Sequence, residues 1–179
     1  MNSEERPSHL GCAADDHGSQ HGKGTYLGGR QRSDGSFPAE DGSADLEATS
    51  LLVLAMLGDG AATLSIAWHA DLHRGLGWLV AAQRDDASFE DPGQGALQRH
   101  AVATYALTEA SGLSPHGALV RGSATAALGH LLEQRDRTGG FHTAGATSTT
   151  TSAWATLAVA SAEFFETLET CYRYTRLLR

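Results

Sequence analysis

The chain has 179 residues, of which 41% are hydrophobic, and a formal net charge of −8. This apolar content suffices for one hydrophobic core, so we expect a single ordinary structured domain. The acidic balance argues against nucleic acid as the main partner and against a polybasic mode of membrane binding.

The sequence predicts a soluble protein of the cytoplasm. The longest apolar run, Leu51 to Leu57, is too short to span a bilayer. The first residues include Glu4 and Glu5 and lack the basic–apolar–small order of a signal peptide. The cysteines, Cys12 and Cys171, are far apart and have no metal-ligand spacing, so we expect reduced thiols, no metal and no cofactor.

Residues 1–23 are polar, rich in Gly, Ser, His and Asp, and show almost no apolar periodicity. Such a segment cannot bury enough surface to offset its ordering entropy, so we predict a disordered tail. His9, His17 and His21 leave a metal-binding tail open as an alternative.

Residues 24–68 form the first of three predicted helical hairpins. Several glycines interrupt its leading helix, and each costs a helix interior about 1 kcal/mol relative to Ala, so we expect this helix to be frayed or absent. A loop with strong turn chemistry follows over 33–38. Asp45 can then cap a helix from Leu46 to Leu57, which Gly58 ends.

Residues 69–120 and 121–162 give the second and third hairpins. The second has a leading helix from Leu72 to Gln83, a loop from Asp85 to Gly95, and a helix from Ala96 to about Ala110. In the third, the helices run from Ala124 to Gln134 and from Ser152 to Ala162. No segment alternates long enough to build a sheet; the threonine run from Thr147 to Thr151 is the one place where a strand stays open.

Residues 163–179 are predicted to form a separate closing helix. Phe164 and Leu168 keep a helical spacing, glutamates come early and arginines late, which is the order that the helix dipole favours. We expect this helix to cover the last open edge of the array, as terminal repeats require.

One pattern recurs in all three hairpins. Phe37, Phe89 and Phe141 recur at a constant interval of 52 residues (positions 37, 89 and 141), and the residues around them stay in register. A fixed period of this size is typical of repeat proteins, in which each unit buries its apolar face against its neighbours.

The best-formed copy reads Arg74-Gly75-x-x-Trp78-Leu79-x-x-x-Gln83, followed six residues later by Phe89. It resembles the glutamine–aromatic repeat of the prenyltransferase and squalene-cyclase superfamily, over about residues 26–162. The family has Gly two places before the aromatic; Gly35 and Gly139 keep it, and Ala87 replaces it. The resemblance implies an all-α fold of helical hairpins, here a partial α/α toroid, an open arc of about three hairpins.

The resemblance also assigns a structural role to the repeated residues. The glutamine amide would bond orphan backbone groups of the next helix, and the aromatic ring would fill the space beneath the turn. The third glutamine falls one place early in the alignment. The predicted repeat joints are Gln31, Phe37, Gln83, Phe89, Gln134 and Phe141.

The chemistry of the family needs groups that this sequence does not place. Terpene cyclases of the family protonate a polyene with an Asp-x-Asp-Asp acid, and the protein-prenyltransferase branch holds zinc with Asp, Cys and His on inner helices. The sequence has no Asp-x-Asp-Asp motif, and neither cysteine lies on a predicted inner helix. We therefore predict no catalytic residue and a non-catalytic repeat module that binds protein or ligand. The alternative is a divergent or truncated terpene cyclase or prenyltransferase-like enzyme acting on isoprenoid or lipid substrates.

Two polar patterns on helices are candidate binding sites. His69 and His73 are four apart but lack the Glu of a zinc-protease motif, so a solvated helix start is the prediction. The second helix of the second hairpin carries a polar stripe, and polar residues stand at the aligned positions of the third hairpin. The stripe suggests a groove for an apolar or amphipathic ligand or a peptide. The alternative is a helix face turned to water. The candidate groove residues are His100, Thr104, Thr108, Ser152 and Thr156.

Three hairpins cannot close a ring, so an open apolar edge should remain. Such an edge favours self-association or a protein partner.

Overall fold

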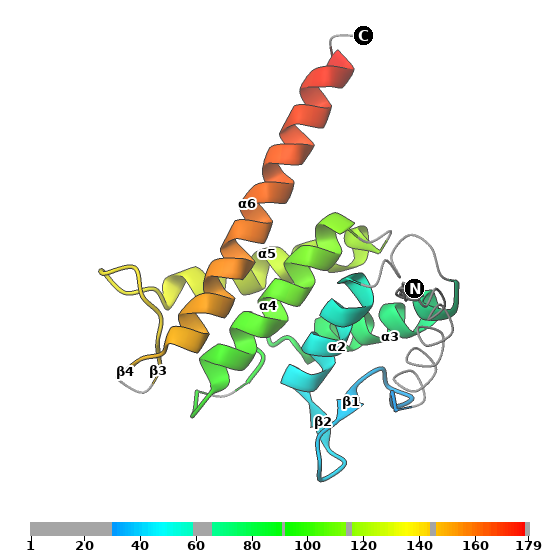
Figure 1. The fold of residues 1–179 in the computed structure, drawn as a ribbon, viewed down its shortest axis with the longest axis vertical. Coiled ribbons are helices and arrows are strands. Elements are labelled where there is room, and N and C mark those ends of the chain that lie inside the picture. The colour runs from blue at the N-terminus through cyan, green and yellow to red at the C-terminus, as the bar shows by residue number, and fades with distance from the viewer. Residues whose placement is uncertain (1–29, 59–65, 91, 114–115, 144–145, 178–179) are drawn as a thin grey trace, which may run out of the picture.

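The computed structural model describes residues 30–58, 66–90, 92–113, 116–143 and 146–177. The predicted tail and the remnant of the first leading helix lie outside these residues. The described chain is mostly helical, which confirms the all-α prediction (Figure 1). Its helices are α2 (Leu46–Gly58), α3 (Ile66–Ala82), α4 (Ala96–Leu113), α5 (Gly117–Glu133) and α6 (Thr149–Leu177).

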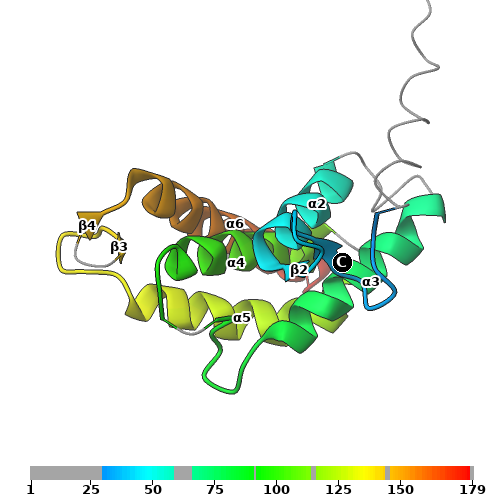
Figure 2. The ribbon, with the colours of Figure 1, turned by 90° about the horizontal axis from the view of Figure 1, so that it is seen from below.

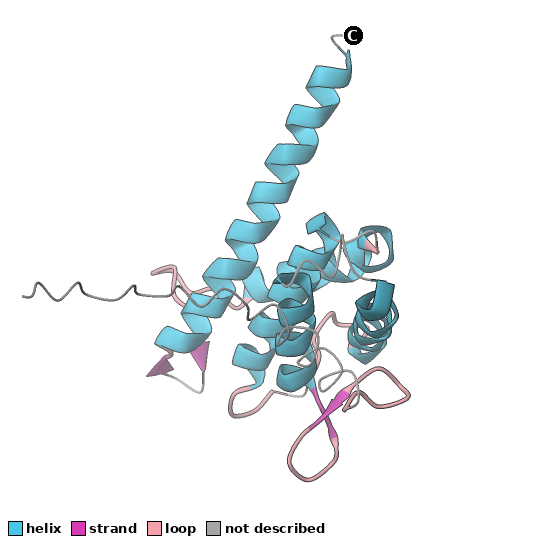
Figure 3. Cartoon of the chain, turned by 45° about the vertical axis from the view of Figure 1, so that its right-hand side comes forward, coloured by secondary structure: helices cyan, strands magenta, loops and turns pink. Residues whose placement is uncertain are grey.

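Two short antiparallel ribbons accompany the helices (Figure 3). β1 (Phe37–Pro38) pairs with β2 (Ala44–Asp45), with Phe37 opposite Asp45. β3 (His142–Thr143) pairs with β4 (Ala146–Thr147). The threonine run thus enters a two-residue strand, but the helix takes over at Thr149, so no larger sheet forms among the described residues.

The helices form two layers. α2, α4 and α6 lie side by side in one layer, and α3 and α5 lie beneath them in the other (Figure 2). α4 is the centre of the array, because it packs against α2 on one side, α6 on the other and α5 below. The second helix of each hairpin therefore belongs to one layer, and the leading helices belong to the other.

The composition of α4 explains its central place. Ala101, Ala103, Ala106 and Ala110 are fully buried, because small side chains let three neighbouring helices approach this one closely. Larger apolar side chains from α2, α3 and α5 then fill the space between the layers. The largest of these include Val53, Leu72, Leu76, Leu79, Val120 and Leu131.

Helix boundaries follow the capping chemistry in part. Asp45 caps α2 as predicted: its Oδ1 accepts the Ala48 N–H at 2.6 Å. α3 and α5 begin earlier than predicted, at Ile66 and Gly117, and the added turns of α5 bring Val120 into the core. α4 runs on through Gly112 to Leu113.

The prediction of a separate closing helix was wrong. α6 is one continuous helix of 29 residues from Thr149 to Leu177, because no glycine or proline follows Gly145 to stop it. Its second half projects away from the body instead of folding back over the last hairpin (Figure 1). The edge that this segment was expected to cover therefore stays exposed.

Candidate functional site

The three predicted joints share one backbone turn. In each, the first residue of the turn donates its N–H to the carbonyl four residues later, at 2.8–3.0 Å. In each, the fourth residue is in the left-handed region, with φ of 95° at Gly35, 66° at Ala87 and 88° at Gly139. The bonds are Arg32 to Ser36, Arg84 to Ser88 and Asp136 to Gly140.

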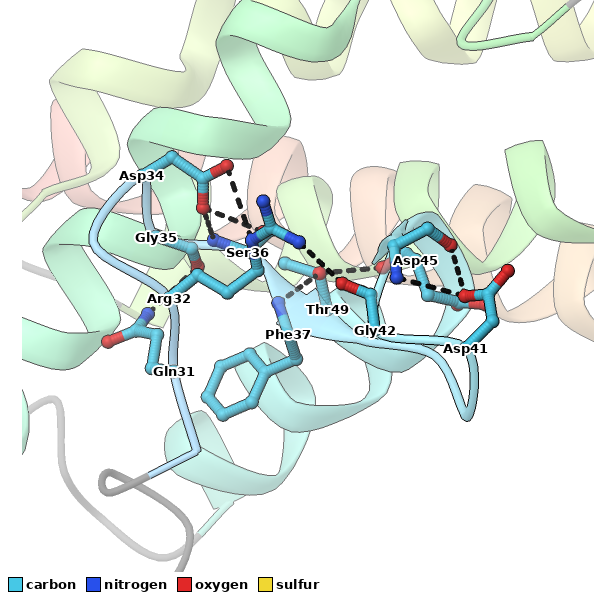
Figure 4. Close-up of polar contacts among 11 residues, drawn as sticks. Gln31, Arg32, Asp34, Gly35, Ser36, Phe37, Asp41, Gly42, Asp45 and Thr49 are labelled. Atoms are coloured by element: carbon cyan, nitrogen blue, oxygen red, sulfur yellow. Dashed lines mark hydrogen bonds and ion pairs between the residues drawn. The ribbon is translucent and has the colours of Figure 1, made fainter.

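Glutamine amides tie the first two joints to the next leading helix. Gln31 Nε2 donates to the carbonyl of Gly35 at 2.9 Å (Figure 4). It also donates to the carbonyl of Asp71 at 2.9 Å. Gln83 Nε2 donates to the carbonyls of Ala87 at 3.2 Å and Ser123 at 3.1 Å. Asp71 and Ser123 lie inside α3 and α5, so the amide adds a second bond to a helical carbonyl instead of satisfying an orphan group at a helix end.

The third joint uses a different residue from the one predicted. Gln134 does not take the role; its backbone N–H caps the end of α5 by bonding the Leu131 carbonyl. Arg135 stands at the interval of 52 from Gln83, and its Nε donates to Gly139 O at 3.2 Å. The described chain has no further leading helix after α6 for this side chain to reach, so the longer bond of the other joints has no counterpart here.

The three joint phenylalanines are buried, with exposed fractions of 2% at Phe37, 7% at Phe89 and 4% at Phe141. The N–H of Phe37 donates to Thr49 Oγ1 at 2.9 Å (Figure 4). That of Phe141 points to Ser152 Oγ at 3.4 Å. Ser152, predicted as a groove residue, thus contacts a joint instead.

The turn carboxylates are structural. Asp34 Oδ1 accepts the N–H and hydroxyl of Ser36 at 3.0 and 2.7 Å, and Asp86 accepts the same pair from Ser88 at 3.0 and 2.6 Å. These hydrogen bonds, chiefly from the serine side chains, lower the pKa of both carboxyls. Both groups are therefore anions at neutral pH.

The predicted polar groove does not form. His100, Thr104 and Thr108 are buried, and His100 lies against α5, with Nε2 3.0 Å from the Ala127 carbonyl. Each threonine hydroxyl bonds a carbonyl of its own helix, which lets the pair sit in the core at little cost. Thr156 is exposed on α6 and Ser152 is half-buried, so the five residues do not share one open wall.

The open face of the α2–α4–α6 layer carries other side chains. Tyr105 and Trp154 lie with ring centroids 6.1 Å apart, beside exposed Leu51. With Glu109 and Leu54 they line a shallow hollow of about 370 Å³. The sequence signal for this face was the seven-residue spacing of Gln98 and Tyr105, which places both side chains on the same side of α4. The prediction followed the stripe that contains His100 instead.

His69 lies in the first turn of α3 and is half-buried, and His73 lies one turn later and is exposed. The His116 ring lies 4.9 Å from His73 and 6.1 Å from His69, centroid to centroid. Burial, followed by the two neighbouring imidazoles, lowers the pKa of His116. Among the residues that the structure places, no group of three His, Cys, Asp or Glu side chains is arranged to hold a metal ion.

The last hairpin exposes an apolar edge. Leu132 of α5 is 41% exposed, and Leu157, Phe164 and Leu168 of α6 are 44%, 57% and 49% exposed. A hollow of about 670 Å³ lies between the C-terminal part of α4, the first and middle turns of α5, and α6. Phe164 and Leu168 help to line it. We name the surface of these four residues the α5–α6 edge.

No family model, curated protein or solved structure matches this chain. Over the described residues, no helix is both long and apolar enough to cross a membrane. The likeness to prenyltransferase and squalene-cyclase repeats therefore stays a prediction, and function has to be argued from the geometry.

Proposed function

We propose that this chain is a non-catalytic helical-hairpin repeat module that binds protein through its α5–α6 edge, and that the partner is a second copy of the same chain. The proposal keeps the family resemblance: the two helical layers would be part of an α/α toroid, an open arc built from prenyltransferase/squalene-cyclase-type repeats. A cytoplasmic site of action belongs to the proposal, because the only two cysteines are far apart in the sequence.

One observation carries it. Some positions of the second hairpin lie under side chains of the third hairpin. The equivalent positions of the third hairpin, 52 residues later, are apolar and less covered. Trp154 packs on Tyr105, and the ring of Phe165 fills the space above Gly112, whereas Leu157 and Phe164 have no further hairpin over them. The equivalent pairs are Leu76 with Leu128, Tyr105 with Leu157, and Gly112 with Phe164.

The exposed edge therefore has the chemistry of a repeat interface that lacks its next unit. Exposed apolar patches on a folded surface mark interaction sites, and terminal repeats of solenoid proteins normally present a polar outer face. Leu157 and Phe164 depart from that rule on a helix whose opposite side is buried against α4.

The apolar side of α6 favours a second copy over an unrelated partner. In an antiparallel pair of α6 helices, an isologous dimer brings the same exposed side chains, Leu157, Phe164 and Leu168, to both sides of the contact, so the patch is complementary to itself. The glutamates of α6 precede its arginines in the sequence, so an antiparallel alignment also sets the acidic half of one helix beside the basic half of the other.

Light scattering coupled to size exclusion tests the proposal. Wild-type protein should have the mass of a dimer, and Phe164→Glu should give a monomer, because it places a charge in the apolar contact. Leu119→Glu is the matched control: Leu119 is 45% exposed on α5 but does not line the hollow beside α6. A monomeric wild type, or a Phe164→Glu variant that keeps the dimer mass, would contradict the proposal.

The hollow on the open face favours a second candidate function, the binding of an isoprenoid or other lipid ligand. A divergent enzyme of the prenyltransferase and squalene-cyclase superfamily would act on such a ligand in this hollow. Its aromatic lining and volume of about 370 Å³ suit an apolar chain. A C15 isoprenoid alcohol should change the fluorescence of Trp154, and the change should vanish in Trp154→Phe. An equal response from the Trp154→Phe variant would rule this hollow out as the binding place.

A further inference from the structure

A third hollow lies between the loop after α3, the first turns of α4 and the end of α5. Its volume is about 500 Å³. Phe89, Pro92 and Leu97 give it an apolar wall, and Asp86, Glu90, His100, His130 and Gln134 supply the polar groups. Neither the α5–α6 edge nor the open-face hollow shares a residue with it.

His100 is the group that points to a ligand. Its ring is 4% exposed, and Nε2 lies 3.0 Å from the Ala127 carbonyl oxygen. Because a carbonyl oxygen only accepts, Nε2 carries the proton and Nδ1 is left as an acceptor. Nδ1 is buried and has no hydrogen-bond partner among the residues that the structure describes. A buried acceptor without a partner is costly, so its presence calls for a donor.

The ring is neutral under ordinary conditions. Burial, only partly opposed by the bond to Ala127, lowers the pKa of His100 to about 4. At neutral pH the hollow therefore offers a lone pair at this position and no positive charge. Anionic ligands gain nothing from it.

The rim adds negative charge. Asp86 stays ionised because Ser88 donates two hydrogen bonds to its carboxylate. Glu90 is paired with Arg99, with Nη2 to Oε2 at 2.6 Å. The residues that line the hollow include no Lys or Arg, so Asp86 gives it a net negative character.

His130 is the second imidazole that lines the hollow. Its ring centroid lies 4.8 Å from that of His100, and its Nδ1 donates to the Asp86 carbonyl at 3.1 Å. The side chain is partly exposed near the end of α5, so the two rings join the buried acceptor to the rim of the hollow.

We propose that this hollow, which we name the His100 pocket, binds a small cationic amine with an apolar body, whose N–H group donates to His100 Nδ1. The apolar body lies against Phe89 and Leu97, and the positive charge is stabilised by Asp86. Phosphates, carboxylates and other anions are excluded by the same groups. The site is separate from the dimer edge and does not depend on it.

Three probes with the same ring and different head groups test the ligand class. Benzylamine is cationic, benzyl alcohol is a neutral donor, and benzoate is an anion. Titration of ¹⁵N-histidine-labelled protein, followed by long-range ¹H–¹⁵N correlation, should move the His100 Nδ1 signal with benzylamine and less with benzyl alcohol. Benzoate should leave it unchanged. No movement with benzylamine, or an equal movement with benzoate, would overturn the proposal.

Variants then locate the binding. His100→Phe should weaken benzylamine binding about tenfold or more, because the acceptor is gone. Asp86→Asn should weaken it roughly two- to fivefold and leave benzyl alcohol unaffected. The matched control is His73→Phe, which removes a histidine outside the pocket and should change nothing.

His100 is buried, so its replacement can cost folding as well as binding. Leu97→Trp avoids that difficulty, because Leu97 is only partly buried and a larger side chain there fills the pocket. This variant should fold, keep its circular dichroism spectrum and lose the response to benzylamine. A folded Leu97→Trp variant with an unchanged response would place the binding elsewhere.

Discussion

Gln83 and Ser123 are forty residues apart and meet twice, since the Gln83 amide donates to the Ser123 carbonyl at 3.1 Å while its Oε1 accepts the Ser123 hydroxyl. One repeat earlier, the Gln31 amide likewise donates to the Asp71 carbonyl, while its Oε1 accepts from Arg74. These contacts hold the turn of one hairpin against the leading helix of the next. They explain why a glutamine, with donor and acceptor on one short side chain, suits the joint.

Replacing Gln83 with Ala should lower the free energy of unfolding by about 1–2 kcal/mol, because two side-chain hydrogen bonds to partly buried carbonyls are lost. Gln134→Ala is the control, since Gln134 precedes the joint in sequence but makes no such bond in the structure. It should change stability by less than about 0.5 kcal/mol. Urea unfolding measures both, and equal effects would contradict the role assigned to Gln83.

Ala87→Gly should stabilise the protein by about 0.5–1 kcal/mol. Ala87 has φ of 66°, and a left-handed conformation costs a residue with a Cβ about 1–2 kcal/mol. Part of this gain is offset by the greater freedom of glycine in the unfolded chain. Thermal unfolding that shows a lower melting temperature for the glycine variant would mean that the Ala87 methyl group makes contacts worth more than the strain.

The reverse change at the first joint should be strongly destabilising. A Cβ at Gly35 would collide with the carbonyl of Arg74, and the backbone there is also left-handed. Gly35→Ala should therefore cost about 3 kcal/mol. Gly42→Ala separates the two causes, because Gly42 has φ of 81° but nothing within contact distance, so only the strain of about 1–2 kcal/mol applies.

The sequence predicted much of this architecture for a physical reason. The interval between Phe37, Phe89 and Phe141 reflects a turn whose backbone bonds recur in all three copies, so pattern and structure share one cause. The third joint was misassigned because Arg135 performs part of the task of a glutamine with a guanidinium donor, and residue type alone does not reveal that. The length of α6 could have been anticipated from the absence of glycine and proline after Gly145.

The candidate site was harder to predict, because polar stripes do not say which side of a helix faces water. His100 and Thr104 were assigned to an open wall, yet both are buried. His100 Nε2 bonds the Ala127 carbonyl of α5, and the Thr104 hydroxyl bonds a carbonyl of its own helix. His130 was not singled out by the sequence analysis. Its closeness to His100 depends on how α5 packs against α4, and no spacing in the sequence encodes that distance.

Gly112→Ala should destabilise the contact between α4 and α6 by about 1–2 kcal/mol. The added Cβ would collide with the Phe165 ring, and this strain outweighs the better helix propensity of alanine. Gly129→Ala is the matched control: Gly129 lies in α5 with open space around its Cα, so alanine should stabilise by up to about 1 kcal/mol. Combining Gly112→Ala with Phe165→Ala should remove the collision, so a double-mutant cycle with no coupling would contradict the contact.

Stability should fall as the pH drops from about 6.5 towards 4, and His100 should be a main cause. Its pKa is 6.5 in the unfolded chain and about 4 in the folded one, where burial opposes the charged ring. Between these values the unfolded state binds the extra proton, so folding is disfavoured by about 1.4 kcal/mol per pH unit, roughly 3 kcal/mol in all. His116, whose pKa is also lowered by burial, acts in the same direction.

Urea unfolding at several pH values measures this slope. His100→Phe should flatten it between pH 6.5 and 4, whatever its effect on stability at pH 7, because the titrating group is gone. The carboxyls of Asp34 and Asp86 act in a lower window, since their lowered pKa values place the loss of their contribution below about pH 4. A His100→Phe variant with the wild-type slope above pH 4 would show that the folded state does not oppose protonation of this ring, and would contradict the burial on which the His100 pocket depends.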